Sequence, residues 1–300
     1  MSDPPLTPFL GESRIYRPPG PLEEVINLWV HGKSPHTQRY YRREAQKFLV
    51  MVGKPLDLVT LADVQAYATV LERSELAVSS QARAIAAIKS LFSFAHRKTG
   101  LLAANPAGPV TAPKVKDALA ERILPEVVVQ MMIGLEPDSR NRVLLRLLYI
   151  AGLRVSELTQ LEWRSLQARE VGGQVLIYGK GGKTRVIKLP ASLWSELQAL
   201  REEVEMDAPI FSSRKQKGHL TEVQVNRIVK AAAMRVPGLD GKVAAKVSPH
   251  WLRHAHASHA MDRGAPVHLV KETLGHASVA TTGRYLHARP TDSSSLYLES

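Results

Sequence analysis

The sequence contains no cysteine. This absence excludes disulfides, thiol nucleophiles and thiolate metal ligands, and it is consistent with a reducing cytosol. Long apolar runs are also missing, because the longest of them, such as VLLRLLYIAGL, contain charges or are too short to span a bilayer. The N-terminus has no cationic start followed by an apolar core and a cleavage site of small residues. We therefore expect a cytoplasmic protein that is not exported and has no membrane partner.

Basic residues are abundant in both halves of the chain. Lysine and arginine number 40 against 28 aspartates and glutamates, which gives a formal net charge of +12. Before residue 112 there are 13 basic and 9 acidic residues, and after it there are 27 and 19. Phosphate contacts dominate the affinity of proteins for nucleic acids, so a polyanion that touches both halves is the favoured partner. A surface charged only for solubility would have the same composition.

The first half has the pattern of a helical domain. Ser34 and Thr60 are expected to cap the starts of two helices, and Gly53 is expected to end the first of these. Residues 1–19 are rich in proline and glycine and are expected to form a leader, and residues 20–107 to form the helical domain. Apolar residues recur at helical spacing over 21–32, 34–53, 60–73 and 78–100.

The second half mixes helices with a small sheet. Prolines and a glycine interrupt the helical pattern near residues 108–120, where we expect a linker. A catalytic domain over 121–290 and a tail over 291–300 would follow. Two β-rich runs, Val175–Tyr178 and Thr184–Leu189, flank a glycine-rich turn and predict a hairpin. Helical patterns cover 124–135, 139–152, 156–166, 191–204, 221–235, 248–264, 265–275 and 278–288. The predicted fold is mainly α with a small antiparallel β element.

A basic edge runs along the second predicted helix. Arg39, Arg43 and Lys47 are four residues apart and therefore share one side of that helix. Two basic-edged helices in a small bundle could hold a phosphate backbone. A solvated helix face explains the same pattern equally well. The candidate DNA-binding residues of this half are Arg39, Arg42, Arg43, Lys47, Arg83 and Lys89.

Two glycine-rich segments of the second half carry candidate phosphate-binding cations. Arg154 lies where a glycine turn meets a helix, and Glu157 follows on the same face. A buried arginine needs an anion, which is either this glutamate or an external phosphate. The segment GKGGKT places Lys180 and Lys183 at the tip of the predicted hairpin. It is no P-loop, because the spacing is wrong and strands flank it. A solvated turn is the alternative to a phosphate-binding one.

The segment SPHWLRHAHASHA concentrates histidines on one predicted helix. His250 and Arg253 are three residues apart near its start, where helix N-termini favour anions. His250 and His254 have the i, i+4 spacing of a metal site. No HExxH motif and no cysteine accompany them, and Asp262 is the only carboxylate nearby in the sequence. A metal site is therefore the weaker interpretation.

A tyrosine near the C-terminus of the sequence has an unusual setting. Tyr285 follows His276 by nine residues, and a phenol with a pKa of about 10 is a poor nucleophile. Fixed cations would lower that pKa, and arginines bind the oxygens of a phosphodiester under attack. A histidine can exchange the proton near neutral pH, and a lysine can protonate the leaving oxygen. Taken singly, a tyrosine is more often a packing residue. The candidate catalytic residues are Arg154, Lys180, His250, Arg253, His276 and Tyr285.

Four blocks of sequence resemble the tyrosine recombinase (lambda-integrase-like) family, and within it the two-domain Xer-type members. They are GLRVSEL, GKGGKTRVIKLP, SPHWLRHAHASH and TLGHASVATTGRYLH. Their order matches the family, as do the intervals of 26 residues from His250 to His276 and of nine more to Tyr285. The segment SPHTQRYYRREAQKF also looks like the N-terminal domain of the family. The resemblance covers roughly residues 20–290. It implies a SAM-like helical core-binding domain and an α+β tyrosine recombinase catalytic domain.

The resemblance also implies a role for each candidate residue. Tyr285 would attack the scissile phosphate and form a 3′-phosphotyrosyl link, and Lys180 would protonate the leaving 5′-oxygen. Neither metal nor ATP nor any other cofactor is implied. The other roles would be phosphate binding by Arg154, Arg253 and His276, proton transfer by His250, and bracing of Arg154 by Glu157.

The family implies double-stranded DNA as the partner and site-specific recombination through a four-way (Holliday) junction as the function. Four subunits, identical or including a paralogue, would act on two DNA sites in the nucleoid. Chromosome dimer resolution and movement of a mobile element both fit. His256 occupies a position where relatives often carry an aromatic residue, and only 15 residues follow Tyr285. Two alternatives remain: a type IB topoisomerase-like enzyme that reseals the same strand, and a catalytically silent DNA-binding accessory protein.

Overall fold

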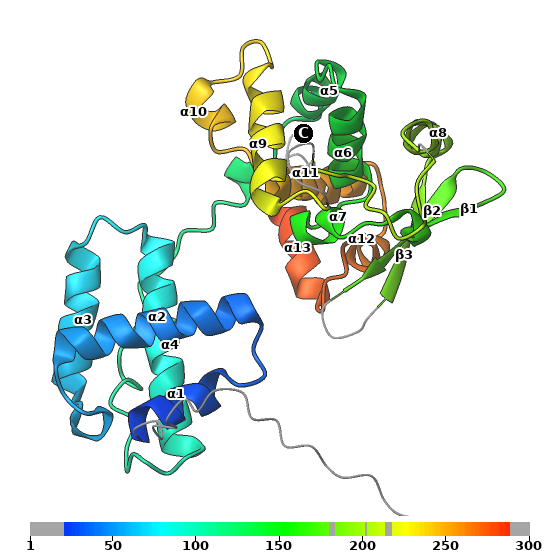
Figure 1. Cartoon of the computed structure of the whole chain (residues 1–300). Coiled ribbons are helices and arrows are strands. Elements are labelled where there is room, and N and C mark those ends of the chain that lie inside the picture. Colours follow the sequence, from blue (N-terminus) through cyan, green and yellow to red (C-terminus); the bar gives the residue numbers. More distant parts are fainter. Residues whose placement is uncertain (1–20, 180–183, 202, 214–217, 289–300) are drawn as a thin grey trace, which may run out of the picture. The chain divides into compact units, whose positions relative to one another are not determined.

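The computed structural model describes residues 21–179, 184–201, 203–213 and 218–288. The chain divides into two compact units, and the division falls between Lys116 and Asp117. Each unit has its own hydrophobic core. The described part of the first unit is helical, and the second unit combines helices with one three-stranded sheet (Figure 1). The prediction of a mainly α fold with a small antiparallel β element is confirmed.

The first unit is a small helical bundle around an aromatic core. The ring of Phe48 on α2 meets Tyr67 on α3 and Phe92 on α4 edge-on, with centroid distances of 5.1 and 5.6 Å. Such edge-to-face pairs add to the free energy gained from burial. The elements are α1 (Pro21–Val30), α2 (Pro35–Val52), the 3-10 turn η1 (Leu56–Leu58), α3 (Leu61–Arg73) and α4 (Val78–Arg97).

The expected caps of this unit are confirmed. The Ser34 hydroxyl accepts the Thr37 amide at 3.3 Å, and Gly53 ends α2 in the left-handed conformation with φ 65°. Thr60 and Asp63 form a reciprocal capping box at the start of α3. Each cap satisfies backbone groups that a helix end leaves without an intrahelical partner, so these residues determine where the helices begin and end.

The second unit is arranged around α11, which contacts α5, α6, α9, α12 and α13 (Figure 1). Leu252 and Ala255 of α11 are completely buried, as is Leu148 of α6. The elements are η2 (Ala120–Arg122), α5 (Glu126–Gly134), α6 (Ser139–Ile150), α7 (Val155–Thr159), η3 (Trp163–Ser165), β1 (Leu166–Ala168), β2 (Gly173–Tyr178), β3 (Thr184–Leu189), α8 (Ala191–Ala199), α9 (Glu222–Met234), α10 (Gly241–Ala244), α11 (Pro249–Asp262), α12 (Val267–Leu274) and α13 (Val279–Ala288).

The three strands are antiparallel in the order β1-β2-β3, which confirms the predicted hairpin and adds a strand. The prediction of a helix over 156–166 is wrong beyond α7. The chain continues there as η3 and β1, because the amide of Trp163 donates to Ala208 (3.2 Å) and that of Arg164 to Met206 (2.7 Å). These partners lie far along the chain, so no local pattern could predict them. The helix predicted over 191–204 also ends early, at Ala199.

None of the described helices combines the length and the apolar character needed to cross a bilayer.

Candidate functional site

Helix α11 presents the central residues of the site. Pro249 occupies its first turn after Ser248, as expected, since a proline there loses no intrahelical hydrogen bond. His250, Arg253 and His254 follow at i, i+3 and i+4, so their side chains leave the helix on one face. His250 is exposed, whereas Arg253 and His254 are buried. The face therefore runs from solvent into the interior of the unit.

Arg253 is a buried cation held by backbone carbonyls. Only 1% of its surface is exposed, and its Nη1 and Nη2 donate to the carbonyls of Gly152 (2.5 Å) and Leu274 (2.6 Å). Burial, followed by the charge of Arg154, lowers its pKa to about 10, so the guanidinium stays protonated at neutral pH. Among the described residues no carboxylate forms an ion pair with it. A buried charge without a counter-ion is costly, so this position suits an external anion.

Gly152 allows this close approach. Its φ is +57°, and a Cβ added there would lie 2.8 Å from Leu274 Cδ2 and 2.9 Å from His256 Cδ2. His256, whose position the sequence left unexplained, therefore packs its ring against the glycine turn. Burial, partly offset by a hydrogen bond with the Tyr149 backbone, lowers its pKa to about 4, and the ring is neutral at pH 7. The turn fits only because residue 152 lacks a side chain.

Arg154 enters the site from the N-terminus of α7. Its Nη1 donates to Glu157 Oε1 at 2.8 Å, and its Nη2 donates to the Gly275 carbonyl at 3.1 Å. Its backbone amide also donates to Glu157 Oε2 at 2.8 Å. The side chain of Arg154 is 40% exposed. Arg154 is thus anchored by Glu157 but remains accessible to a ligand.

Arg185 on β3 is a part of the site that the sequence did not reveal to us. Its two terminal nitrogens donate to both oxygens of Glu157 at 2.8 Å, and its Nε donates to the Thr273 carbonyl at 2.8 Å. A signal was present, because Arg185 lies on the same strand face as the buried Ile187 and Leu189. A cation on the inward face of a strand needs an anionic partner, either a carboxylate or an external phosphate.

Glu157 connects the two arginines. Burial of its carboxyl favours the neutral form, but the hydrogen bonds from Arg185 and Arg154 outweigh that effect and lower its pKa to about 2. The carboxylate is therefore ionised throughout the neutral range. With Arg253 included, the cluster has three guanidinium groups and one carboxylate, a surplus of two positive charges.

His276 directly follows Gly275, which ends α12 in the left-handed conformation with φ 63°. Its Nδ1 pairs with the Thr282 hydroxyl at 2.9 Å, which fixes the ring. Burial, followed by the charges of Arg253 and Arg154, lowers its pKa to about 4. The pKa of His250 is also lowered, by the partial burial of its ring, part of which remains exposed, and then by the charges of Arg253 and Arg154. His276 is therefore a neutral imidazole at the edge of the cationic cluster.

Tyr285 of α13 lies in a small apolar cluster with Leu119, Ile123 and Leu274 and is 6% exposed. Its hydroxyl is 2.6 Å from Nδ1 of His254. Burial raises its pKa, although the charges of Arg253 and Arg284 act in the opposite direction. The expectation of a lowered phenol pKa is wrong for this conformation, because desolvation of the phenolate exceeds the effect of the cations.

The remaining predicted residues of this unit, Lys180 and Lys183, lie outside the described residues. The structure describes the strands on either side of them, β2 and β3, up to Gly179 and from Thr184. Among the described residues, no group of three or more histidine, aspartate or glutamate side chains could hold a metal ion.

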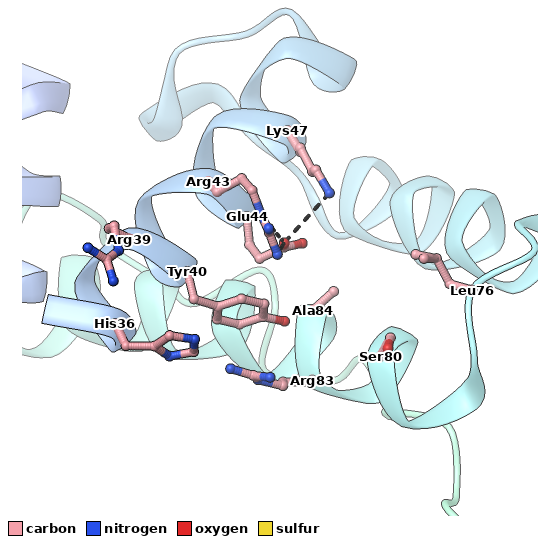
Figure 2. A pocket seen from close by; sticks show the side chains of 10 residues that line it. All are labelled: His36, Arg39, Tyr40, Arg43, Glu44, Lys47, Leu76, Ser80, Arg83 and Ala84. Carbon is pink, nitrogen blue, oxygen red and sulfur yellow. Dashed lines mark hydrogen bonds and ion pairs between the residues drawn. The ribbon is translucent and has the colours of Figure 1, made fainter. Parts of the chain in front are cut away.

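A basic pocket lies on the first unit between α2 and α4 (Figure 2). Its cavity volume is about 470 Å³, and Arg39, Arg43, Lys47 and Arg83 line it. The guanidinium of Arg83 lies over the Tyr40 ring, 3.9 Å from its centroid. A guanidinium stacked in this way keeps its donors exposed at its rim.

One buried acid supports this pocket. Glu44 is 4% exposed, and its Oε1 pairs with Arg43 at 3.1 Å and with Lys47 at 3.7 Å (Figure 2). The structure does not bring two other predicted DNA-binding residues to the pocket. Arg42 lines a different groove, beside α1, and Lys89 donates to the carbonyls of Gly108 (3.1 Å) and Val110 (2.5 Å).

Comparisons with known proteins place the chain in a family. Residues 121–292 match the model of the phage integrase family, and residues 22–98 match its N-terminal SAM-like domain. Tyrosine recombinase XerD of Rhizobium meliloti (strain 1021) is 32% identical over 274 residues, covering 85% of this chain and 86% of the relative. Tyrosine recombinase XerA of Pyrococcus furiosus (strain ATCC 43587 / DSM 3638 / JCM 8422 / Vc1) is 33% identical over 269 residues, covering 88% of each.

Solved structures share the fold. A lambda integrase (75–356) dimer bound to a COC′ core site has a TM-score of 0.68 at 17% identity, covering 91% of this chain and 96% of that one. The XerH recombinase in a post-cleavage complex with palindromic difH substrate has a TM-score of 0.65 at 22% identity, covering 88% and 80%. The chain therefore belongs to the phage integrase family, as a tyrosine recombinase related to the Xer proteins and an enzyme of site-specific DNA recombination.

Proposed function

We propose that this enzyme cuts and rejoins DNA strands through a covalent link between Tyr285 and the 3′-phosphate of the cut strand. The observation that carries the proposal is the convergence of two arginines on one turn. Nη2 of Arg253 and Nη2 of Arg154 donate to the carbonyls of the adjacent residues Leu274 and Gly275. The two arginines are 99 positions apart in the chain. A single phosphate could therefore contact both guanidinium groups.

The charge of the cluster supports a phosphodiester as its ligand. The surplus of two positive charges contributed by Arg154, Arg185 and Arg253 with Glu157 exceeds the single charge of a phosphodiester. The five-coordinate species formed during attack carries about two negative charges, so fixed cations stabilise it more than the ground state. His276, which directly follows the turn, would hold a further phosphate oxygen.

The proposed step exchanges one phosphate ester bond for another. The Tyr285 oxygen bonds to phosphorus while the P–O5′ bond breaks, which leaves a 3′-phosphotyrosyl link and a 5′-hydroxyl. Lys180 is proposed as the general acid that protonates the 5′-oxygen, and His250 as a group that assists proton transfer around the phosphate. Attack by the 5′-hydroxyl of another strand reverses the chemistry. The energy of the broken bond stays in the ester, so neither ATP nor a metal ion is needed.

Double-stranded DNA is the proposed partner of both units. The basic pocket of Arg39, Arg43, Lys47 and Arg83 supports a phosphate contact in the first unit. Four subunits, identical or including a paralogue, would act on two sites through a four-way junction. The enzyme would work in the cytoplasm at the nucleoid, with chromosome dimer resolution as the candidate role. Residues 108–120 would link the DNA-binding and catalytic domains.

A nicked duplex tests the nucleophile, because a cut beside the nick releases a short fragment and traps the covalent complex. We expect a protein–DNA band that survives boiling in detergent and excess EDTA and is lost in Tyr285→Phe. Tyr149→Phe is the matched control, since Tyr149 is another buried tyrosine with a hydroxyl 3.0 Å from a histidine. A band that persists in Tyr285→Phe would rule out Tyr285 as the nucleophile.

Two further measurements test the phosphate ligands and the type of reaction. Arg154→Ala and Arg253→Ala should abolish the band while binding of the duplex persists; cutting at the wild-type rate would contradict their role. Two duplexes with different labels should yield recombinant products. Relaxation of supercoils without any exchange between duplexes would indicate a topoisomerase-like enzyme instead.

A further inference from the structure

His254 has no role in the reaction described so far, although it contacts the reacting atom. Its Nδ1 is 2.6 Å from the Tyr285 hydroxyl, and among the described residues it is the hydrogen-bond partner of that oxygen. This distance is within the reach of direct proton transfer, about 2.6–3.2 Å. The other proposed proton-transfer group, His250, touches His254 rather than the phenol, with ring centroids 4.3 Å apart.

Helix α11 positions both His254 and Arg253, a proposed phosphate ligand. It follows Arg253 directly on α11 and is 8% exposed. Its ring lies between His250, in edge contact, and the ring of Tyr285, whose centroid is 5.6 Å away. A buried ring in contact on two sides has little freedom to turn, so its Nδ1 stays directed at the phenol.

We propose that His254 is the catalytic base that accepts the Tyr285 proton as the phenol attacks the phosphate. The inference rests on the proposed function, in which Tyr285 is the nucleophile. The Oη–H bond breaks, the proton moves to His254 Nδ1, Oη bonds to phosphorus, and the P–O5′ bond breaks with a proton from Lys180. In the rejoining step the imidazolium returns its proton to the departing Tyr285 oxygen, so His254 is neutral again after each cycle.

Charge around His254 links its basicity to the bound phosphate. Burial, followed by the charges of His250, Arg122, Arg253 and Arg284, lowers its pKa to about 3, so the ring is neutral and able to accept a proton at pH 7. The same effects make it a weak base while the site is empty. A bound phosphodiester neutralises the neighbouring cations and thereby raises the pKa of His254 in the complex in which the Tyr285 proton is transferred. The titratable and charged groups that face His254 are His250 and Arg253 of α11, Arg122 of η2, and Arg284 and Tyr285 of α13.

The test replaces His254 by asparagine, whose side-chain oxygen can accept the hydrogen bond from Tyr285 but cannot take the proton. The substrate is a nicked duplex with a bridging 5′-phosphorothiolate at the cleavage site. Its sulfur leaves without protonation, so loss of an acid has no effect on it and loss of a base does. Single-turnover cleavage is followed from pH 6 to pH 9 with wild type, His254→Asn, Lys180→Ala and the control His259→Asn.

The control makes the same change at another buried histidine of α11. Nδ1 of His259 is 3.0 Å from a tyrosine hydroxyl, that of Tyr149, which is not the proposed nucleophile. We expect His254→Asn to cut about 100-fold more slowly than wild type on both the normal and the sulfur-containing substrate. His259→Asn should match wild type. Lys180→Ala should be slow on normal DNA and fast on the phosphorothiolate.

The pH profile separates a base from a structural residue. On the phosphorothiolate the wild-type rate should be nearly constant from pH 6 to pH 8. The His254→Asn rate should rise about tenfold per pH unit, because hydroxide must then remove the proton. A parallel profile in the two proteins, or an unchanged rate in the variant, overturns the proposal. A wild-type rate that itself rises tenfold per unit overturns it without any variant.

A wrong nucleophile and a wrong base give different experimental results. If Tyr285→Phe still forms the covalent band, the proposed nucleophile is wrong and His254 has no phenol to serve. If that band is lost in Tyr285→Phe but His254→Asn keeps the wild-type rate and profile, only the role of His254 is wrong. Circular dichroism and duplex binding of each variant show whether it is folded. Should His254→Asn not fold, the wild-type profile still decides.

Discussion

The carboxylate of Glu157 offers a quantitative test of how the site is held together. Its pKa falls from 4.5 to about 2 on folding, its side chain is only 7% exposed, and it accepts hydrogen bonds from Arg154 and Arg185. One pKa unit corresponds to about 1.4 kcal/mol, so the ionised carboxylate stabilises the second unit by about 3 kcal/mol. We expect Glu157→Gln to lower the free energy of unfolding by about this amount at pH 6.

The pH dependence gives the sharper test. Because the folded-state pKa is depressed, the stabilisation is complete above the unfolded-state value of 4.5 and is lost as the pH falls toward 2. The difference between wild type and Glu157→Gln should therefore shrink from about 3 kcal/mol at pH 6 to about 1 kcal/mol at pH 3. Urea unfolding followed by tryptophan fluorescence measures it, since three of the four tryptophans, Trp163, Trp194 and Trp251, lie in the second unit.

Glu162→Gln is the matched control. Glu162 pairs with Arg164, whose side chain is 64% exposed, so we expect a loss below about 1 kcal/mol. An equal destabilisation of Glu157→Gln at pH 6 and pH 3 would refute the reasoning, because the loss would then come from packing rather than from the ionised carboxylate.

Two further variants test the glycine turn and the basic pocket. Gly152→Ala should lower the melting temperature and abolish cleavage, because its Cβ would lie 2.8 Å from Leu274 Cδ2 at a φ of +57° and the carbonyl of this residue holds Arg253; wild-type melting and cleavage would contradict this. Arg83→Ala should weaken DNA binding and reduce the slope of log affinity against log salt by about 1. The control Arg97→Ala changes an exposed arginine of the same helix outside the pocket. Equal salt slopes for Arg83→Ala and wild type would exclude a phosphate contact.

Features governed by neighbours in sequence were predicted well. Ser34, Gly53 and the pair Thr60–Asp63 set helix ends through contacts within four residues, and each was identified from the sequence. The β2–β3 hairpin was predicted from its turn and its β-branched residues for the same reason. Where the backbone pairs with a distant segment, prediction failed. The run from Trp163 continues as η3 and β1 because its amides bond to residues 206–208.

The candidate site shows the same division. The sequence by itself determined which chemical groups are present and their order, from Arg154 to Tyr285, and this was sufficient to indicate the family. It did not reveal Arg185, whose partner Glu157 is 28 positions away.

Only the tertiary structure decided the protonation state of Tyr285, the proposed nucleophile. Tyr285 is buried against Leu119 and Ile123, residues more than 160 positions earlier in the chain, and its hydroxyl meets His254. Its pKa is raised rather than lowered, because the cost of desolvating the phenolate depends on how completely those distant side chains exclude water. The sequence specifies which charged residues are available near the phenol. The packing around Tyr285 determines whether burial or these charges have the larger effect on its pKa.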